Sequence, residues 1–139
     1  MNFRLMSIDN YEAVYHLWSR TPGMGLNPAD ASRDGILKYL SRNPSTCFIA
    51  ENNNEVIGVI MSGHDGRRGF IYHLAVKASE RNKGIGGTLV RYAIESLRKE
   101  GIHKVSLVVF SNNELGNAFW DNKGFSSRND LIYRNKSID

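Results

Sequence analysis

Residues 81–87, Arg-Asn-Lys-Gly-Ile-Gly-Gly, place two cations beside three glycines. This segment follows an apolar, strand-like run at residues 70–76 and precedes an amphipathic helical pattern that starts near Thr88. Glycine lets the backbone approach a ligand closely, and the free N–H groups and partial positive charge of a helix N-terminus attract anions. The segment, called the glycine loop below, is therefore predicted to bind a phosphate or a pyrophosphate.

Two common phosphate-binding motifs do not fit the glycine loop. A P-loop requires a lysine after its last glycine, whereas Lys83 precedes Gly84. A dinucleotide fingerprint requires a third glycine where this sequence has Leu89, and an acidic residue at the end of the next strand, which residues 105–110 lack. From the residues alone, the remaining alternative to a phosphate site is a solvated turn that binds nothing.

A third pattern in the glycine loop resembles a family signature. Arg81-x-x-Gly84-x-Gly86 is similar to the [RQ]-x-x-G-x-[GA] signature of the GNAT superfamily, the acetyl-CoA-dependent N-acetyltransferases. Residues 113–125 resemble the family's N-x-x-A-x-x-[FL]-Y-x-x-x-G-F helix, and the whole resemblance runs from about Val56 to the end of the chain. The resemblance implies an acyltransferase that uses acetyl-CoA as co-substrate and no metal. Its acceptor would be a primary amine of a small molecule or of a peptide or protein N-terminus.

The resemblance also implies which residues hold the co-substrate. Backbone N–H groups of the glycine loop would bind the CoA pyrophosphate, and the pantetheine arm would lie between two parallel strands that splay apart, at residues 72–76 and 106–110. A backbone N–H near Leu74 or Ala75 would donate to the thioester carbonyl oxygen. The implied binding residues are Leu74, Ala75, Val76, Arg81, Asn82, Lys83, Gly84, Ile85, Gly86, Gly87, Thr88, Asn113 and Trp120.

The attacking amine must lose a proton, because most free amines are protonated near pH 7. Relatives often place a proton carrier on the strand before the loop, where this sequence has Tyr72 and His73. Strand alternation predicts that Tyr72 and His73 lie on opposite faces of the sheet. Each also has a structural alternative: Tyr72 as a wall of the acceptor pocket, and His73 as a buried core histidine.

Trp120 departs from the family pattern. Many relatives have a tyrosine there that protonates the leaving thiolate, and the indole N–H of tryptophan does not titrate in water. A thiol with a pKa near ~8.5 can still leave as the thiolate, and Tyr133 is an alternative proton donor. The candidate catalytic residues are therefore Tyr72, His73 and Tyr133. Trp120 also motivates a second hypothesis, a CoA-binding regulatory module with little or no catalytic activity.

The acceptor is expected to bind near the first two helices and the hairpin tips, the variable part of the family. Trp18 lies in this region, but its place on an apolar helix face favours a core position. The turn at residues 64–68 contains Arg67 and Arg68, which either attract an acidic acceptor or are solvated. The sequence favours solvation for both arginines.

Length and composition fit one globular domain. The 139 residues, 41% hydrophobic and 23% charged, predict a single acetyltransferase domain over residues 1–139. The basic residues behind the net charge of +4 are scattered, which argues against nucleic acid, and no apolar run approaches the ~20 residues of a membrane span. The single Cys47 excludes an internal disulfide, and these features favour the cytoplasm. Dimers are common in the family, so the resemblance leaves a homodimer open.

Strand and helix patterns predict an α/β fold with a mixed central sheet. Strands are expected at residues 1–5, 46–51, 56–62, 69–76, 104–110 and 131–134. Helices are expected at residues 5–20 and 88–100, with two more that are capped by Asp30 or Ser32 and by Asn112 or Asn113. The helix that follows the glycine loop requires its flanking strands to be parallel. The GNAT resemblance implies the same arrangement: six to seven strands, about four helices and splayed parallel strands at the cofactor site.

Overall fold

The protein's computed structural model describes residues 1–139, which divide into two compact units, Met1–Val108 and Val109–Asp139. The prediction of one acetyltransferase domain over the whole chain stays a prediction. None of the helices combines the length and the apolar character needed to cross a lipid bilayer.

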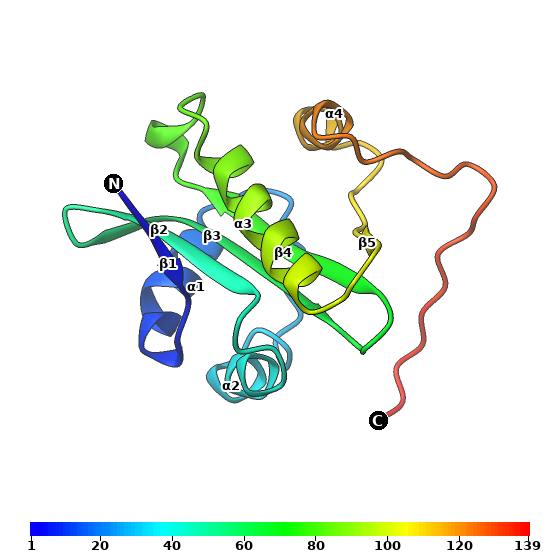
Figure 1. Cartoon of the computed structure of the whole chain (residues 1–139), viewed down its shortest axis with the longest axis horizontal. Coiled ribbons are helices and arrows are strands. Elements are labelled where there is room, and N and C mark those ends of the chain that lie inside the picture. The colour runs from blue at the N-terminus through cyan, green and yellow to red at the C-terminus, as the bar shows by residue number, and fades with distance from the viewer. The chain divides into compact units, whose positions relative to one another are not determined.

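A five-stranded mixed sheet forms the centre of the first unit (Figure 1). Its strands lie in the spatial order of the chain and are antiparallel, except that the last two are parallel. The strands are β1 (Asn2–Leu5), β2 (Cys47–Asn52), β3 (Glu55–His64), β4 (Gly69–Val76) and β5 (Val105–Ser106). The predicted mixed α/β fold is confirmed, and the bounds of β4 match the prediction.

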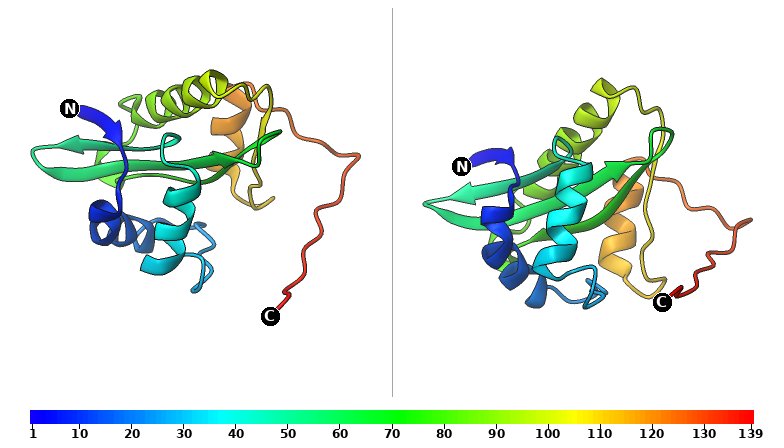
Figure 2. Two further views of the ribbon diagram at one scale, coloured as in Figure 1. Left: turned by 60° about the horizontal axis from the view of Figure 1, so that its bottom comes forward. Right: turned by 90° about the horizontal axis from the view of Figure 1, so that it is seen from below.

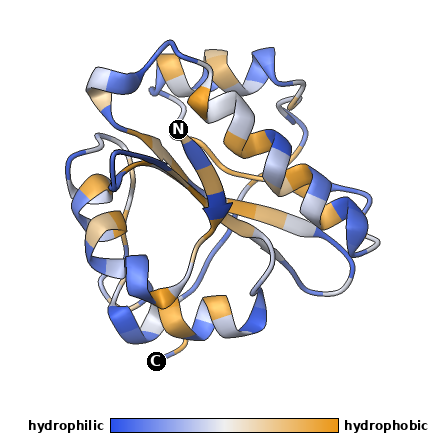
Figure 3. Ribbon diagram, turned by 60° about the vertical axis from the view of Figure 1, so that its left-hand side comes forward, coloured by the Kyte–Doolittle hydropathy of each residue, from blue (hydrophilic) through white to orange (hydrophobic).

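Helices cover both faces of this sheet (Figure 2). The short 3-10 helix η1 (Ile8–Asn10) leads into α1 (Tyr11–Ser19), which lies with α2 (Arg33–Arg42) on one face, and α3 (Ile85–Lys99) lies on the other. The strands at the centre of the sheet are hydrophobic (Figure 3), so both faces bury apolar surface. On the α1 and α2 face the core includes Trp18, which is 1% exposed. The predicted core position of Trp18 is therefore confirmed.

A β-bulge interrupts the pairing of β3 with β4. Met61 pairs with His73 and Ser62 pairs with Ile71, so that Tyr72 has no partner in the register. A bulge adds one residue to one strand and reverses the facing of the side chains beyond it. The bulge therefore breaks the strict alternation expected along this strand.

As a result, Tyr72 and His73 both face the layer formed by α1 and α2. The Tyr72 ring lies 5.7 Å from Tyr39 of α2, and the His73 ring lies 4.9 Å from Trp18 of α1. The prediction that Tyr72 and His73 lie on opposite faces is wrong, because strict alternation does not hold across a bulge.

The second unit contains one helix, α4 (Glu114–Asn122). Asn113 caps it, since its Oδ1 accepts a hydrogen bond from the Gly116 N–H at 2.9 Å. Gly124 follows the helix in a left-handed conformation with φ of 88°. Both end signals agree with the sequence prediction.

Two predicted strands differ from the structure. The strand expected at residues 104–110 is reduced to Val105–Ser106, and residues 131–134 form no strand. The sheet therefore has five strands rather than six to seven. Strand propensity depends on pairing with a neighbouring strand, so apolar residues alone do not ensure that a strand forms.

The first helix also begins later than predicted. Residues 5–20 were expected to be helical as one unit, but Leu5 ends β1 and the helical turns start at Ile8. The Asn10 side chain accepts a hydrogen bond from the Ser7 N–H at 2.9 Å, and this contact marks the start of the helical segment.

Candidate active site

The glycine loop connects β4 to α3 through two left-handed residues. After the 3-10 helix η2 (Ala78–Glu80), Arg81 is extended, Asn82 has φ of 64° and Gly84 has φ of 80°. A glycine adopts this conformation without strain, and Gly84 is the N-cap of α3. The chain thus turns sharply into the first turn of the helix.

The N-terminus of α3 has free backbone donors. The Thr88 N–H donates to the Gly84 carbonyl at 3.0 Å as the first bond of the helix, so the N–H groups of Ile85, Gly86 and Gly87 precede the hydrogen-bonded ladder. No side chain caps this end, and its first turn contains no acidic residue. A Cβ atom built on Gly84 would meet nothing within 4 Å, so the loop is open there.

Arg81 is the cation of the glycine loop that lacks an acidic partner. Lys83 Nζ lies 3.1 Å from Glu80 Oε2, which offsets its charge. The Arg81 Nε contacts only the Val76 carbonyl oxygen, at 3.5 Å, and forms no ion pair. Free N–H donors, an unpaired guanidinium and open space together fit a bound phosphate or pyrophosphate.

The Thr88 side chain is engaged within the helix. Its hydroxyl donates to the Gly84 carbonyl oxygen at 2.9 Å. Thr88 therefore stabilises the first turn of α3, and its predicted contact with the co-substrate stays a prediction.

β4 pairs with β5 only where the two strands begin. The parallel register joins Gly69 to Val105 and Phe70 to Ser106, and it does not continue toward Val76. Within the first unit, the β5-side edge of β4 is therefore free of a strand partner over Leu74, Ala75 and Val76. The end of the pairing leaves unpaired backbone groups along this strand edge, and the expected splay of two strands around the cofactor stays a prediction.

His73 is partly buried. Its Nδ1 is buried without a hydrogen-bond partner, as is the Nε1 of Trp18, on which the imidazole ring rests. Burial lowers the pKa of His73, and the nearby Asp30 carboxylate offsets part of this effect. The imidazole is therefore neutral near pH 7, in an environment that matches the core-histidine alternative.

Tyr72 reaches the protein surface. It is 57% exposed, and its ring contacts Phe70 at 4.7 Å and Tyr39 at 5.7 Å. It stands at the bulge, two residues before Leu74. Of the two candidate proton carriers on β4, Tyr72 is the more exposed.

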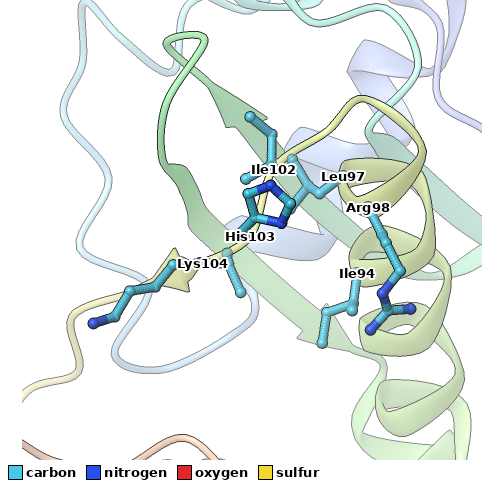
Figure 4. A pocket seen from close by; sticks show the side chains of 7 residues that line it. Ile94, Leu97, Arg98, Ile102, His103 and Lys104 are labelled. Atoms are coloured by element: carbon cyan, nitrogen blue, oxygen red, sulfur yellow. The ribbon is translucent and has the colours of Figure 1, made fainter.

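A cavity of about 250 Å³ lies far from this site, along the C-terminal half of α3 (Figure 4). Ile94 is nine residues beyond Ile85, about 13 Å along the helix axis. The cavity therefore does not extend the glycine loop. Its lining residues are Ile94, Leu97, Arg98, Ile102, His103, Lys104 and Val105.

The remaining predicted site residues belong to the second unit. Asn113 is engaged as the cap of α4 through its Oδ1, which leaves its Nδ2 as a donor. Trp120 contacts Phe119 and Phe125, each at 5.0 Å between ring centroids. Tyr133 is 68% exposed and lies in a segment without a strand. The predicted residues of β4 and those of the glycine loop thus all lie within the first unit.

The chain is similar to known acetyltransferases. The sequence model of the Acetyltransferase (GNAT) family matches residues 11–125. An acetyltransferase of Pectobacterium atrosepticum is 33% identical over 114 residues, which cover 82% of this chain and 79% of that protein.

Solved structures share the fold. Ard1 from Thermoplasma volcanium has a TM-score of 0.80 at 21% identity, and the matched region covers 90% of this chain and 82% of the Ard1 chain. The PaiA N-acetyltransferase of Thermoplasma acidophilum, solved in complex with coenzyme A, has a TM-score of 0.79 at 22% identity, with coverage of 91% and 90%. Together with the match of the family model over most of the chain, these likenesses identify the protein as an acyltransferase that belongs to the GNAT family of acetyltransferases.

Proposed function

We propose that this acyltransferase moves an acetyl group from acetyl-CoA to a primary amine of a small molecule or of a peptide N-terminus. The observation that carries the proposal is the uncapped N-terminus of α3, with its free N–H groups and the unpaired Arg81. The PaiA acetyltransferase of the same fold was solved with coenzyme A, which supports a CoA donor here.

In this proposal the glycine loop holds the pyrophosphate of CoA. The N–H groups of Ile85, Gly86 and Gly87 donate to phosphate oxygens, and Arg81 adds a positive charge. Asn82 and Gly84 shape the turn through their left-handed conformations. When bound, acetyl-CoA supplies an activated thioester, so that R–NH₂ and CH₃CO–SCoA give CH₃CO–NHR and HSCoA.

The unpaired edge of β4 positions the reacting group. A backbone N–H at Leu74 or Ala75 serves as the donor to the thioester carbonyl oxygen, where negative charge develops. Tyr72 borders the acceptor and is the proposed partner of its amine proton, while Tyr133 and Asn113 stay predictions for the leaving thiol and the pantetheine arm. His73, partly buried against Trp18, stays a second prediction for that proton transfer.

A thiol-release assay tests the proposal. The purified protein is given acetyl-CoA and a panel of primary amines, and free CoA thiol is detected with a chromogenic disulfide. Cys47 should not contribute to the signal, because it is buried and burial raises the pKa of its thiol to about 12. Amine-dependent thiol release, with the N-acetylated amine seen by mass spectrometry, would support the proposed transfer.

The second candidate function is a CoA-binding regulatory module, which Trp120 favours because it stands where relatives have a tyrosine. This module would bind acetyl-CoA tightly, as measured by calorimetry, and release no thiol with any amine of the panel. The two functions therefore give opposite results in the same assay.

Three further predictions rest on the family resemblance and composition alone. Size-exclusion chromatography with light scattering would test the homodimer, and cell fractionation would test the cytoplasmic location. Limited proteolysis with and without acetyl-CoA would test whether residues 1–139 behave as one domain.

A further inference from the structure

A hollow of about 510 Å³ opens beside the β3–β4 hairpin, on the face that α2 covers. The C-terminal end of α2, the hairpin turn and the start of β4 line it. It is called the hairpin hollow below. Tyr72 lines it, so the hollow adjoins the bulge of β4.

Two guanidinium groups in the hairpin hollow lack an acidic partner. Arg42 comes from α2 and Arg68 from the hairpin, and neither side chain forms an ion pair or a hydrogen bond within the protein. A pair of unpaired guanidiniums at one cavity attracts an anion, since each offers a planar set of N–H donors that matches a carboxylate or a phosphate.

The other ionisable groups of the hairpin hollow are already engaged. The Asp65 carboxylate accepts hydrogen bonds from the backbone N–H groups of Arg67 and Arg68 at 2.8 and 2.9 Å, which lower its pKa. The His64 Nδ1 accepts from the Gly66 N–H at 3.0 Å, so its Nε2 carries the hydrogen and lies 2.7 Å from Glu100 Oε1. The Asp65 carboxylate keeps its charge, so two arginines against one carboxylate leave the lining with a net charge of about +1.

Tyr39 contributes a hydroxyl group without a hydrogen-bond partner and an aromatic ring to the hairpin hollow. Its hydroxyl is buried and has no hydrogen-bond partner. It lies against Gly63, where an added Cβ would come within 2.5 Å of it, and Gly63 also lines the hollow. Buried hydroxyl groups rarely lack a partner in native proteins. The Tyr72 ring contacts both the Tyr39 ring and the Phe70 ring, and the three rings give the hollow an apolar surface.

We propose that the acceptor amine carries an anionic group, a carboxylate or a phosphate, which Arg42 and Arg68 hold in the hairpin hollow. The amino group then lies near the bulge of β4 and the linking chain lies along the three aromatic rings. The bulge at Tyr72 lies three residues beyond Gly69, roughly 10 Å along a strand, so several bonds must separate the amine from the anion. This inference rests on the proposed acetyl transfer to an amine.

The role of Arg68 differs from the solvation that the sequence favours for both hairpin arginines. Arg68 lines the hairpin hollow, whereas its neighbour Arg67 does not. Both residues are exposed, and both use their backbone N–H to bind Asp65. Arg67 is therefore a matched control: replacing either side chain removes one charge and leaves the backbone bonds of the turn in place.

The kinetic test compares ω-amino carboxylates of three to six methylenes with the ω-amino amides of the same length. We expect kcat/KM to favour the carboxylates by about tenfold or more, because a charge-assisted hydrogen bond is worth roughly that factor. Arg68→Gln and Arg42→Gln should raise KM for the carboxylates about tenfold and leave the amides unchanged, while Arg67→Gln changes neither. The ω-aminoalkyl phosphates, run in parallel, decide which anion the hollow prefers.

A binding measurement makes the test independent of turnover. The N-acetylated ω-amino carboxylates are titrated into the full chain, and binding is followed by calorimetry, with thermal melting to check that each variant is folded. Wild type and Arg67→Gln should bind, and Arg68→Gln should bind about tenfold more weakly. If no amine releases thiol while this pattern holds, the proposed transfer fails and the anion site stands.

Three results would overturn the inference. They are equal kcat/KM values for carboxylates, phosphates and amides, equal effects of Arg67→Gln and Arg68→Gln, and no binding of either anionic probe to the folded wild type. In the first two cases the acetyl transfer itself would remain intact, so the two proposals are separable.

Discussion

Replacing Gly84 with glutamate separates a phosphate-binding loop from a simple turn. Gly84 has φ of 80°, and a Cβ added there meets nothing within 4 Å. The substitution therefore causes backbone strain without a steric clash. It also places a carboxylate beside the free N–H groups of Ile85 and Gly86, where the CoA pyrophosphate is proposed to bind.

Gly101 provides a matched control at the other end of the same helix. Its φ is 81°, and its Cβ position is equally open. The fifteen residues of α3 are about 22 Å long, and the two glycines flank them at opposite ends. Left-handed strain costs a non-glycine residue about 1–2 kcal/mol, so each glutamate variant should lower the Tm by roughly 3–8 °C. The Gly101→Glu variant should be the less stable, by up to ~1 kcal/mol, because its charge opposes the helix dipole.

The two variants should differ sharply in acetyl-CoA binding. At ~5 Å, a carboxylate and one phosphate charge repel each other by about 1–3 kcal/mol for effective dielectric constants between 80 and 20. Calorimetry should therefore give a Kd about 5- to 150-fold weaker for Gly84→Glu and an unchanged Kd for Gly101→Glu. Gly84→Gln, which has the same size without the charge, should bind better than Gly84→Glu. The difference between the two should shrink as salt rises from 0.05 to 0.5 M.

One outcome would refute this reasoning. If Gly84→Glu is folded and binds acetyl-CoA as tightly as Gly101→Glu does, the loop does not hold the pyrophosphate. The uncapped helix end would then be only the turn that the sequence left open as an alternative.

Three other predictions follow from particular contacts. Gly63→Ala should cost about 1–3 kcal/mol of unfolding free energy by overpacking, since its Cβ would lie 2.5 Å from both the Tyr39 hydroxyl and the Asn43 side chain; denaturant unfolding measures this, and an unchanged midpoint would contradict the packing. Unfolding free energy should fall as pH drops below about 6.5, because burial lowers the pKa of His73 and the unfolded chain binds the proton first; His73→Gln should flatten this part of the curve, and an identical curve would exclude the residue. Trp120→Tyr should change kcat less than about tenfold, because a thiolate leaves without protonation; a hundredfold gain in thiol release would show that a general acid was missing.

The helices and strands whose ends are marked by glycines or turns were predicted well from the sequence. The bounds of β4 were predicted because the turn that contains Gly66 precedes it and a mostly apolar run continues to Val76. Gly101, with φ of 81°, terminates α3 as a left-handed residue should. The predicted start of α3 at Thr88 was three residues late, because two glycines in the first turn lower the apparent helix propensity.

The candidate site depends on features that leave no such signal. The bulge at Tyr72 comes from the register between β3 and β4, which a single strand does not reveal. Likewise, Tyr39 and Arg42 belong to α2, and only the fold brings them to the start of β4. Sequence reasoning therefore identified the proposed co-substrate loop from its own residues and missed the hollow, which three separate segments assemble.

The charges of the hairpin hollow bear on how the acceptor amine becomes neutral. In a free ω-amino carboxylate, the negative carboxylate stabilises the ammonium form of the amine. When Arg42 and Arg68 bind the carboxylate, this stabilisation is lost, and the two arginines also disfavour another cation nearby. Burial lowers the pKa of His73, and its Nδ1 is buried without a partner, so that nitrogen does not serve as the base in this scheme. The rise of kcat/KM with pH should therefore begin at lower pH for ω-amino carboxylates than for the amides, after correction for the pKa of each free amine. Arg68→Gln should bring the two profiles together, whereas profiles that already coincide in the wild type would show that anion binding plays no part in deprotonation.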